Sequence, residues 1–201
     1  MFDSTMLRII DPPLDRIGRR FAAAGVSANA ITLVGFAIGL LAVPALAAEW
    51  YGAALALILL NRLADGIDGA IARHTRLTDL GGYLDILCDF IFYAAVAFGF
   101  ALGRPENAIA AAFLLLSFVG TGTSFLAYAI MAAKRQLTND LRGSKSLYYL
   151  GGLTEGTETI AVFVAFCLWP DGFVPLAYGF GALCWVTTVS RALSAWRTLR
   201  D

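Results

Sequence analysis

The sequence predicts an all-α integral membrane protein with six transmembrane helices in one bundle, preceded by an amphipathic helix beside the membrane. Three observations support this prediction. Of the 201 residues, 59% are hydrophobic and only 15% are charged. The mean hydropathy is +0.71, which is unusual for a soluble domain. Six apolar stretches of about 17 to 25 residues, each long enough to cross a bilayer, nearly exhaust the chain and leave no room for a soluble domain.

The N-terminal segment, residues 1–28, is expected to lie in the cytosol or at the interface. Residues 7–22 mix Leu, Ile and Phe with Arg after the break predicted at Pro12 and Pro13. This mixture is typical of a short helix on an anionic membrane surface, although an ordinary charged tail is an alternative interpretation. The first apolar stretch begins too late, after Arg16, Arg19 and Arg20, to be a cleaved signal peptide.

The remaining residues, 29–201, are expected to form one transmembrane domain. Its six predicted spans are residues 30–49, 51–72, 83–103, 107–131, 156–174 and 176–196.

The basic residues predict the orientation of the bundle. They gather before the first span and after the second, fourth and sixth, which are all on one side if the helices alternate. The opposite loops hold little charge, essentially Glu49, Arg104, Glu106 and Asp171. Because cytoplasmic loops are enriched in Lys and Arg, we expect a multi-pass protein of the inner, cytoplasmic membrane with both termini in the cytoplasm.

Cysteine and histidine do not predict a metal site. Cys88, Cys167 and Cys184 all fall inside apolar spans, where a thiol behaves as a small hydrophobic group, and we infer no disulfide. His74 is the single histidine and has no partner at ligand spacing, so a solvated loop position is expected for it.

Four aspartates within 25 residues are the main clue to function. Asp65 and Asp68 share one face of the second predicted span, and Asp85 and Asp89 share one face of the third. An antiparallel helix pair would bring the four carboxylates together, where their charges repel unless they are protonated or bridged by cations. An all-oxygen cluster suits Mg²⁺ or Mn²⁺, and two ions about 3.5 to 4 Å apart are a natural fit. The active site is therefore expected at the cytoplasmic end of the bundle.

The neighbours of the aspartates indicate a phosphate ligand. Gly69 and Ala72 lie on the same side of the helix as Asp65, and Gly81 lies one turn before Asp85. These small residues let a phosphate chain approach the helix backbones, and Arg73 is positioned to reach it. The site therefore favours a pyrophosphate.

The pattern resembles the signature of the CDP-alcohol phosphatidyltransferase family of membrane enzymes. That signature reads Asp, two residues, Asp-Gly, two residues, Ala-Arg, and then Gly, three residues, Asp, three residues, Asp. One spacing departs from it, because seven residues rather than the usual eight separate the Arg from the second Gly. The residues that match are Asp65, Asp68, Gly69, Ala72, Arg73, Gly81, Asp85 and Asp89.

The resemblance implies about six membrane helices, a site that faces the cytosol and a homodimer. It also implies that Asn29 and Thr32, near the start of the first span, approach the nucleotide, as does Thr78 in the shortened loop. The alternative interpretation makes Asn29 a helix N-cap and Thr32 a packing hydroxyl.

The implied reaction transfers a phosphatidyl-type group from a CDP-linked lipid, CDP-diacylglycerol, to a small alcohol, with release of CMP. Asp65, Asp68 and Asp85 would hold metal ions, while Asp89 would complete the second metal site and take the proton from the attacking hydroxyl. Arg73 would stabilise the leaving phosphate. We expect membrane lipids and the two substrates as partners, and no nucleic acid.

The acceptor site is predicted near the segments that follow the fourth span. Lys134, Arg135 and Lys145 are candidates for binding a phosphorylated acceptor such as a sugar or glycerol phosphate, although the same cations serve as topology anchors. Glu155 and Glu158 are candidates for hydrogen bonds to an unphosphorylated polyol or an amino alcohol. Their alternative role is at a helix start, with Thr154 as the N-cap.

Three alternatives compete with an enzyme. A cation or proton transporter also places carboxylates in a membrane, but it does not need Gly69, Ala72 and Arg73 at these offsets. A non-catalytic scaffold of this shape would be expected to lose a metal ligand, and none is missing. A purely structural acid–base network fails because Arg62 and Arg73 supply two positive charges against four negative ones.

Overall fold

The computed structural model describes residues 3–135 and 153–200, and within these ranges every regular element is a helix. The long helices are α1 (Asp3–Ala23), α4 (Tyr51–His74), α5 (Asp79–Gly103), α6 (Ala108–Lys134) and α8 (Phe173–Leu199). The shorter ones are α2 (Ala28–Leu40), α3 (Ala42–Ala47), α7 (Gly156–Leu168) and the single 3₁₀ turns η1 (Pro105–Asn107) and η3 (Pro170–Gly172). Lys145, a predicted acceptor residue, lies outside the described residues.

Four helical stretches are long and apolar enough to cross a membrane, within the described part of the chain. They are Ala28–Ala47, Asp79–Gly103, Pro105–Lys134 and Pro170–Leu199. Each contains or overlaps one predicted span, and together they confirm a membrane protein with several transmembrane helices.

The predicted count of six spans is not confirmed. α4 has 24 residues, enough to cross, but it carries Arg62 at its middle and Asp65 and Asp68 in its second half. α7 has 13 residues and ends at Leu168, before the predicted end of the fifth span. At a rise of about 1.5 Å per residue it is roughly 20 Å long, shorter than a hydrocarbon core of about 30 Å.

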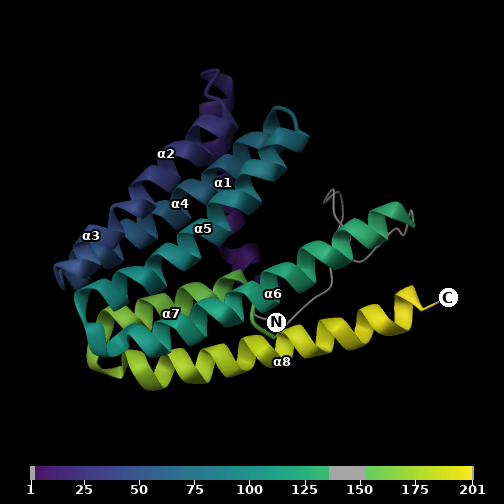
Figure 1. Ribbon diagram of the computed structural model, residues 1–201. Coiled ribbons are helices and arrows are strands. Elements are labelled where there is room, and N and C mark those ends of the chain that lie inside the picture. The colour runs from purple at the N-terminus through teal and green to yellow at the C-terminus, as the bar shows by residue number, and fades with distance from the viewer. Residues whose placement is uncertain (1–2, 136–152, 201) are drawn as a thin grey trace.

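The helices converge at one end of the molecule and diverge at the other (Figure 1). α2, α4 and α5 form one group, and α6 and α8 run side by side as a second, so the two groups make a V. The core fills the convergent end with aromatic rings that make stacked or edge-to-face contacts. Its fully buried rings are Phe92, Phe100, Phe163, Phe166 and Phe173.

Gly122 of α6 and Gly181 of α8 serve contacts inside the protomer. A Cβ at Gly122 would lie 2.5 Å from the Phe90 ring of α5, and one at Gly181 would lie 2.6 Å from the Phe113 ring of α6. These glycines therefore leave room for aromatic side chains of neighbouring helices.

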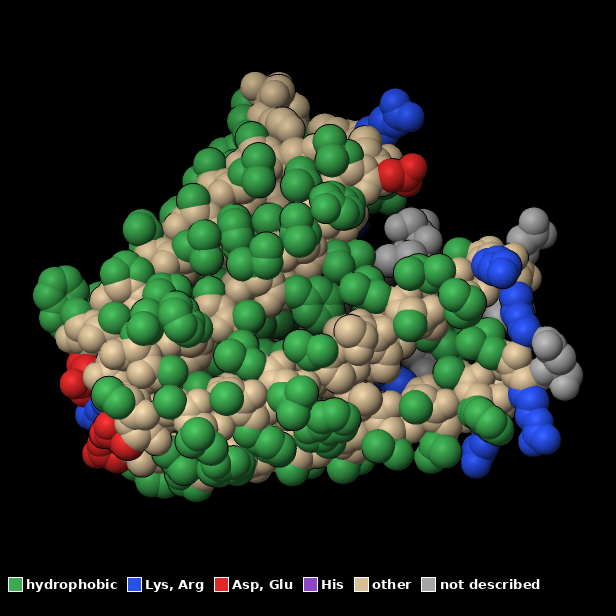
Figure 2. Space-filling view, viewed as in Figure 1, with side chains coloured by type: hydrophobic (Ala, Val, Ile, Leu, Met, Phe, Trp, Pro, Cys, Tyr) green, Lys and Arg blue, Asp and Glu red, His purple; other side chains and the backbone are tan. Residues whose placement is uncertain are grey.

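An ion cluster ties the connections together at the convergent end. Arg104, after α5, donates hydrogen bonds to Glu49 at 2.7 Å and to Asp171 at 2.5 Å. Glu49 precedes α4 and Asp171 precedes α8, so the cluster joins three connections that are far apart in sequence. Figure 2 shows acidic and basic side chains gathered at this end, with an apolar surface between it and the basic ends of α6 and α8.

The N-terminal segment is a helix packed on α4, which excludes the charged-tail interpretation for the described residues. It is longer than predicted, and it continues through Pro12 and Pro13, where a break was expected. Leu14 is 8% exposed. A Cβ at Gly66 would lie 2.6 Å from Leu14. α1 thus contacts the turn of α4 that carries Asp65 and Asp68.

The contact at Gly18 of α1 leaves no space for a side chain. A Cβ there would lie 2.5 Å from the Ala70 Cβ and 2.8 Å from the Ala70 carbonyl carbon. Because backbone atoms of α4 cannot move as a side chain can, Gly18→Ala is expected to shift α1 and destabilise the protein by about 1–3 kcal/mol. Thermal unfolding of the purified protein measures the change.

The matched control is Gly52→Ala, in the first turn of α4, where an added Cβ meets nothing within 4 Å. It should leave the melting temperature unchanged or raise it slightly, since alanine is the better helix former. Equal melting temperatures for Gly18→Ala and the wild type would contradict tight packing of α1 on α4.

Candidate functional site

The carboxylates converge where α4 ends and α5 begins. The two helices are joined by residues 75–78, so the last turns of α4 face the first turns of α5. Asp65, Asp68 and Asp85 each offer an oxygen, and these three oxygens lie within 4.8 Å of one another. Asp68 is buried, Asp65 is half-buried and Asp85 is exposed. The predicted meeting of two helix faces is confirmed for these three residues.

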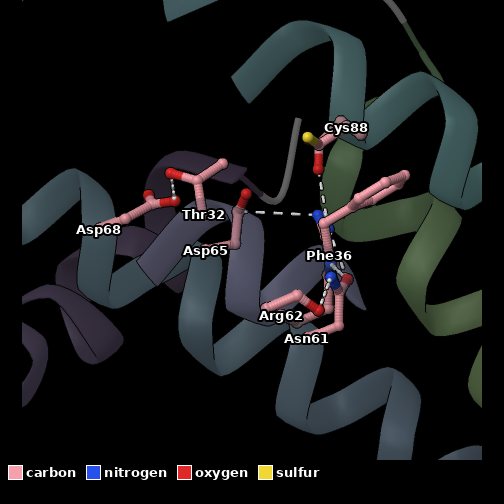
Figure 3. A pocket seen from close by; sticks show the side chains of 9 residues that line it. Thr32, Phe36, Asn61, Arg62, Asp65, Asp68 and Cys88 are labelled. Atoms are coloured by element: carbon pink, nitrogen blue, oxygen red, sulfur yellow. Dashed lines mark hydrogen bonds and ion pairs between the residues drawn. The ribbon is translucent and has the colours of Figure 1, made fainter. Parts of the chain in front are cut away.

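Asp68 is held by a hydrogen bond from α2, which packs against α4. The hydroxyl of Thr32 on α2 donates to Oδ2 of Asp68 at 2.5 Å, and Asp68 is 6% exposed (Figure 3). Thr32 thus contacts the cluster directly, and its hydroxyl oxygen also lies 3.1 Å from the backbone carbonyl oxygen of Ala28. A purely packing role for Thr32 does not account for the bond to Asp68.

Asp89 lies one turn after Asp85 on α5, and its partner is Arg62 rather than Thr32. It lines the same small cavity as Asp65 and Asp68, together with Thr32 and Cys88. Its Oδ1 accepts a hydrogen bond from Nη2 of Arg62 at 2.7 Å. From the sequence, Arg62 was considered only as a possible counter-charge for the four aspartates. Its reach across to Asp89, 27 residues on, depends on the rotation of α4 against α5, which residue spacing does not give.

Three predicted nucleotide contacts meet at the start of α5. Thr78 is the N-cap of this helix, and its side chain accepts a hydrogen bond from the backbone N–H of Gly81 at 3.0 Å. A Cβ at Gly81 would lie 3.2 Å from Oδ1 of Asn29 on α2 and 3.1 Å from the Thr78 hydroxyl. Asn29 is not the N-cap of α2, because Ser27 takes that place. The shortened loop therefore still brings Asn29, Thr78 and Gly81 together.

The predicted phosphate-binding arginine is engaged by α1. Arg73 forms an ion pair with Asp11 at 3.6 Å, and both side chains are 47% exposed. Its Nη1 lies 3.7 Å from where a Cβ of Gly69 would be, so the guanidinium passes over the bare surface of α4. Ala72 is half-buried on the same helix. An exposed pair of this kind is weak, so an anion at Gly69 can compete for Arg73.

His74 is not in a loop as expected, because α4 extends to include it. Its Nε2 lies 2.8 Å from Oδ1 of Asp15 on α1. This hydrogen bond is the main cause of the lowered pKa of the Asp15 carboxyl, and the hydrogen bond from Arg19 lowers it further. The last turn of α4 contacts α1, and composition alone did not predict that the helix extends as far as His74.

The predicted acceptor residues that the structure describes lie on two different elements, the end of α6 and the start of α7. Lys134 is the last residue of α6 and Arg135 follows it, and both are exposed. Glu155 and Glu158 form a capping box at the start of α7, in which the Glu155 backbone N–H donates to Glu158 at 3.0 Å. Glu155 rather than Thr154 is therefore the N-cap. The Thr154 hydroxyl instead lies 2.9 Å from that of Thr187 on α8, where both are buried.

The donor set of the cluster fits a divalent cation. Three carboxylates with converging oxygens repel one another without positive charge between them, and one of the three is buried. Oxygen-only ligands suit Mg²⁺ or Mn²⁺ rather than a thiophilic metal. Asp65, Asp68 and Asp85 are the residues that would hold such an ion.

Comparisons with known proteins place the fold. Over 91% of this chain and 93% of the other, the structure superposes with a TM-score of 0.73 and 21% identity on the Mycobacterium tuberculosis phosphatidylinositol phosphate synthase PgsA1 with CDP-DAG bound. The apo form of the same synthase gives a TM-score of 0.68, also at 21% identity, over 90% of this chain and 95% of that one. At this identity the similarity establishes the fold.

Curated relatives extend over nearly the whole chain. The inner membrane protein YnjF of Escherichia coli is 55% identical over 100% of this chain and 98% of its own. Archaetidylinositol phosphate synthase of Pyrococcus horikoshii is 30% identical over 94% of each. Residues 25–190, which include all four aspartates, match the family model described as CDP-alcohol phosphatidyltransferase. The chain is therefore a membrane enzyme of phospholipid biosynthesis that belongs to the CDP-alcohol phosphatidyltransferase family.

Proposed function

We propose that this enzyme transfers a phosphatidyl-type group from CDP-diacylglycerol to a small alcohol and releases CMP. The observation that carries the proposal is the convergence of Asp65, Asp68 and Asp85, beside helix surfaces kept bare by Gly69 and Gly81. A pyrophosphate needs this combination, because cations must neutralise its charge and small residues must let it approach. The mycobacterial synthase of the same fold has CDP-DAG bound, which supports a CDP-linked lipid as the donor.

We propose two divalent ions, Mg²⁺ or Mn²⁺, for the reaction. Bound ions would neutralise the charge that develops on the pyrophosphate as CMP departs. Asp65, Asp68 and Asp85 would hold one ion between them, and Asp89, in the same cavity, would contribute to a second.

The side chains then have distinct roles in the transfer. The acceptor hydroxyl oxygen forms a bond to the lipid-side phosphorus, the bond from that phosphorus to the CMP oxygen breaks, and Asp89 takes the hydroxyl proton. Arg73, released from Asp11, would stabilise charge on the leaving phosphate. Asn29, Thr32 and Thr78 would contact the nucleotide, because they lie around Gly81 and Asp68.

A phosphorylated polyol is the acceptor class that the relatives favour. Two of them are named as synthases of inositol phosphate lipids. Lys134, Arg135 and Lys145 are the cations proposed for such a phosphate. The capping box accounts for Glu155 and Glu158 as a helix start, so a role for them with an unphosphorylated polyol or amino alcohol rests on the sequence alone.

We further propose six membrane crossings and a cytoplasmic active site. α4 and the predicted span 156–174, of which α7 forms residues 156–168, would add to the four apolar stretches. Lys134 and Arg197 lie in the last turns of α6 and α8, and Glu49 and Asp171 pair with Arg104 at the opposite, convergent end. Figure 2 shows basic side chains at the first end and acidic ones at the second. This polarity supports the positive-inside orientation, with α1 along the cytoplasmic surface. We also propose a homodimer, which the family resemblance implies.

The test is release of CMP by the purified enzyme. The protein in detergent is given Mn²⁺ or Mg²⁺, CDP-diacylglycerol and a panel of alcohols that includes inositol phosphate, glycerol phosphate, inositol and serine. CMP and a new lipid are expected with one acceptor class, and excess chelator should stop both. Absence of CMP with every acceptor, or turnover that a chelator leaves unchanged, would overturn the proposal. A transporter would move ions and release no CMP.

A further inference from the structure

Arg62 is the most extensively bonded charged side chain near the carboxylates, and nothing in the family signature accounts for it. It lies on α4, one turn before Asp65, and its side chain is 15% exposed. Its guanidinium is 3.6 Å from Asp65 (Figure 3) and 2.7 Å from Asp89 on α5. A single buried cation thus faces one carboxylate from each helix.

Arg62 is fixed from the α2 side by Asn61. The Asn61 side-chain oxygen accepts hydrogen bonds from Nε of Arg62 at 2.8 Å and from Nη2 at 2.6 Å. The Asn61 amide in turn donates to the backbone carbonyl of Gly35 at 2.9 Å, and Asn61 is 4% exposed. Gly39 leaves the space for Asn61, since a Cβ there would lie 2.9 Å from its amide. The guanidinium therefore has a set orientation.

Two aromatic rings of α5 complete the enclosure. The Arg62 guanidinium carbon lies 4.8 Å from the Phe92 ring centroid and 5.5 Å from that of Tyr93. The Tyr93 hydroxyl accepts from Nη1 of Arg62 at 3.4 Å and donates to Oδ2 of Asp89 at 3.5 Å. The planar guanidinium of arginine can stack on rings while it donates to three acceptors, and lysine lacks this ability.

The four aspartates are consequently divided into two kinds. Asp65, Asp68 and Asp85 bring their oxygens together, whereas Asp89 lies in the same cavity but turns an oxygen to Arg62. Without the guanidinium, Asp89 and Asp65 would face each other as like charges, and both would be available to a cation.

We propose that Arg62 is a positioning residue that holds Asp89 apart from the three-carboxylate cation site and aims it at the reacting hydroxyl. The catalytic part of this inference rests on the proposed function. In the substrate-free enzyme, Arg62 therefore limits tight cation binding to the site of Asp65, Asp68 and Asp85, and the second ion, to which Asp89 would contribute, binds only together with the substrate.

The experiment measures Mn²⁺ binding and CMP release separately, on Arg62→Gln and Arg62→Lys. Arg62→Gln removes a positive charge beside the cluster and frees Asp89, so Mn²⁺ is expected to bind at least about tenfold tighter or to a second tight site. CMP release is expected to fall at least about tenfold, because the reacting groups lose their alignment. Arg62→Lys keeps the charge, so Mn²⁺ affinity should stay near that of the wild type while CMP release still falls.

Arg104→Gln is the matched control. It makes the same charge change at the convergent end, about 20 Å away along α5 at a rise of about 1.5 Å per residue, and should alter neither readout at the site. Opposite movement of affinity and turnover in Arg62→Gln separates positioning from mere loss of structure, which would weaken both. Unchanged or weaker Mn²⁺ binding in Arg62→Gln, or full turnover in Arg62→Lys, would overturn the proposal.

The two proposals fail in different ways. Mn²⁺ binding requires no lipid and no acceptor, so it tests the division of the aspartates even if the wild type releases no CMP. Absence of CMP from the wild type would instead count against the proposed function.

Discussion

Asp68→Asn is expected to lower CMP release at least about a thousandfold and to remove tight Mn²⁺ binding. Asp68 is the buried member of the three-carboxylate site, and Thr32 already holds one of its oxygens. The amide has nearly the same shape but no negative charge, so the site loses a third of its charge while Thr32 can still donate to the amide oxygen. Isothermal titration with Mn²⁺ and an assay of CMP measure the two losses.

Asp79→Asn is the control for this prediction. Asp79 is in the first turn of α5 and exposed, and it is not among the converging carboxylates. Its substitution changes the charge by the same amount and should cost at most about 1 kcal/mol through the helix dipole, with turnover close to that of the wild type. Near-normal turnover of Asp68→Asn would show that the carboxylate cluster is not the catalytic centre.

Asp89→Asn is expected to lower turnover at least about a hundredfold while CDP-lipid still binds, because the enzyme loses the proposed proton acceptor. The asparagine oxygen can still accept from Arg62, whose guanidinium stays fixed by Asn61. The fold and the site of Asp65, Asp68 and Asp85 should therefore be preserved.

Three measurements on this variant distinguish the roles. Single-turnover assays give the rate, a CDP-lipid binding assay gives affinity, and Mn²⁺ titration should show the tight site intact. If Asp89→Asn turned over at the wild-type rate, the assignment of Asp89 as the base would be wrong. If it lost the tight Mn²⁺ site, Asp89 would belong with the other three carboxylates rather than with Arg62.

Residue spacing predicted the parts of this site that one helix face determines. Asp65 and Asp68 on α4, and Asp85 on α5, converge because the helices are antiparallel neighbours across a short connection. The same local logic placed Gly81 on the helix of Asp85, whereas Thr78 came from the family resemblance and was expected in the shortened loop rather than at the N-cap of α5.

The features that spacing missed depend on how helices rotate and pack. Arg62 reaches Asp89, and Arg73 reaches Asp11, because of side-chain directions that follow from tertiary contacts. The predicted count of six spans was not confirmed for a related reason. α4 is long enough but keeps its charges where α1, α2 and α5 cover them, and α7 ends where Trp169 leaves the helix.

The cluster of Arg104, Glu49 and Asp171 holds together the apex of the V, where its two arms meet. With three connections clamped at the apex, any rotation of α6 and α8 against the other arm moves the apex least and the open ends most (Figure 1). The carboxylates lie towards those open ends, on the last turns of α4 and the first turns of α5. Rotation of one arm of the V against the other would therefore change the surroundings of the carboxylates more than the packing at the apex.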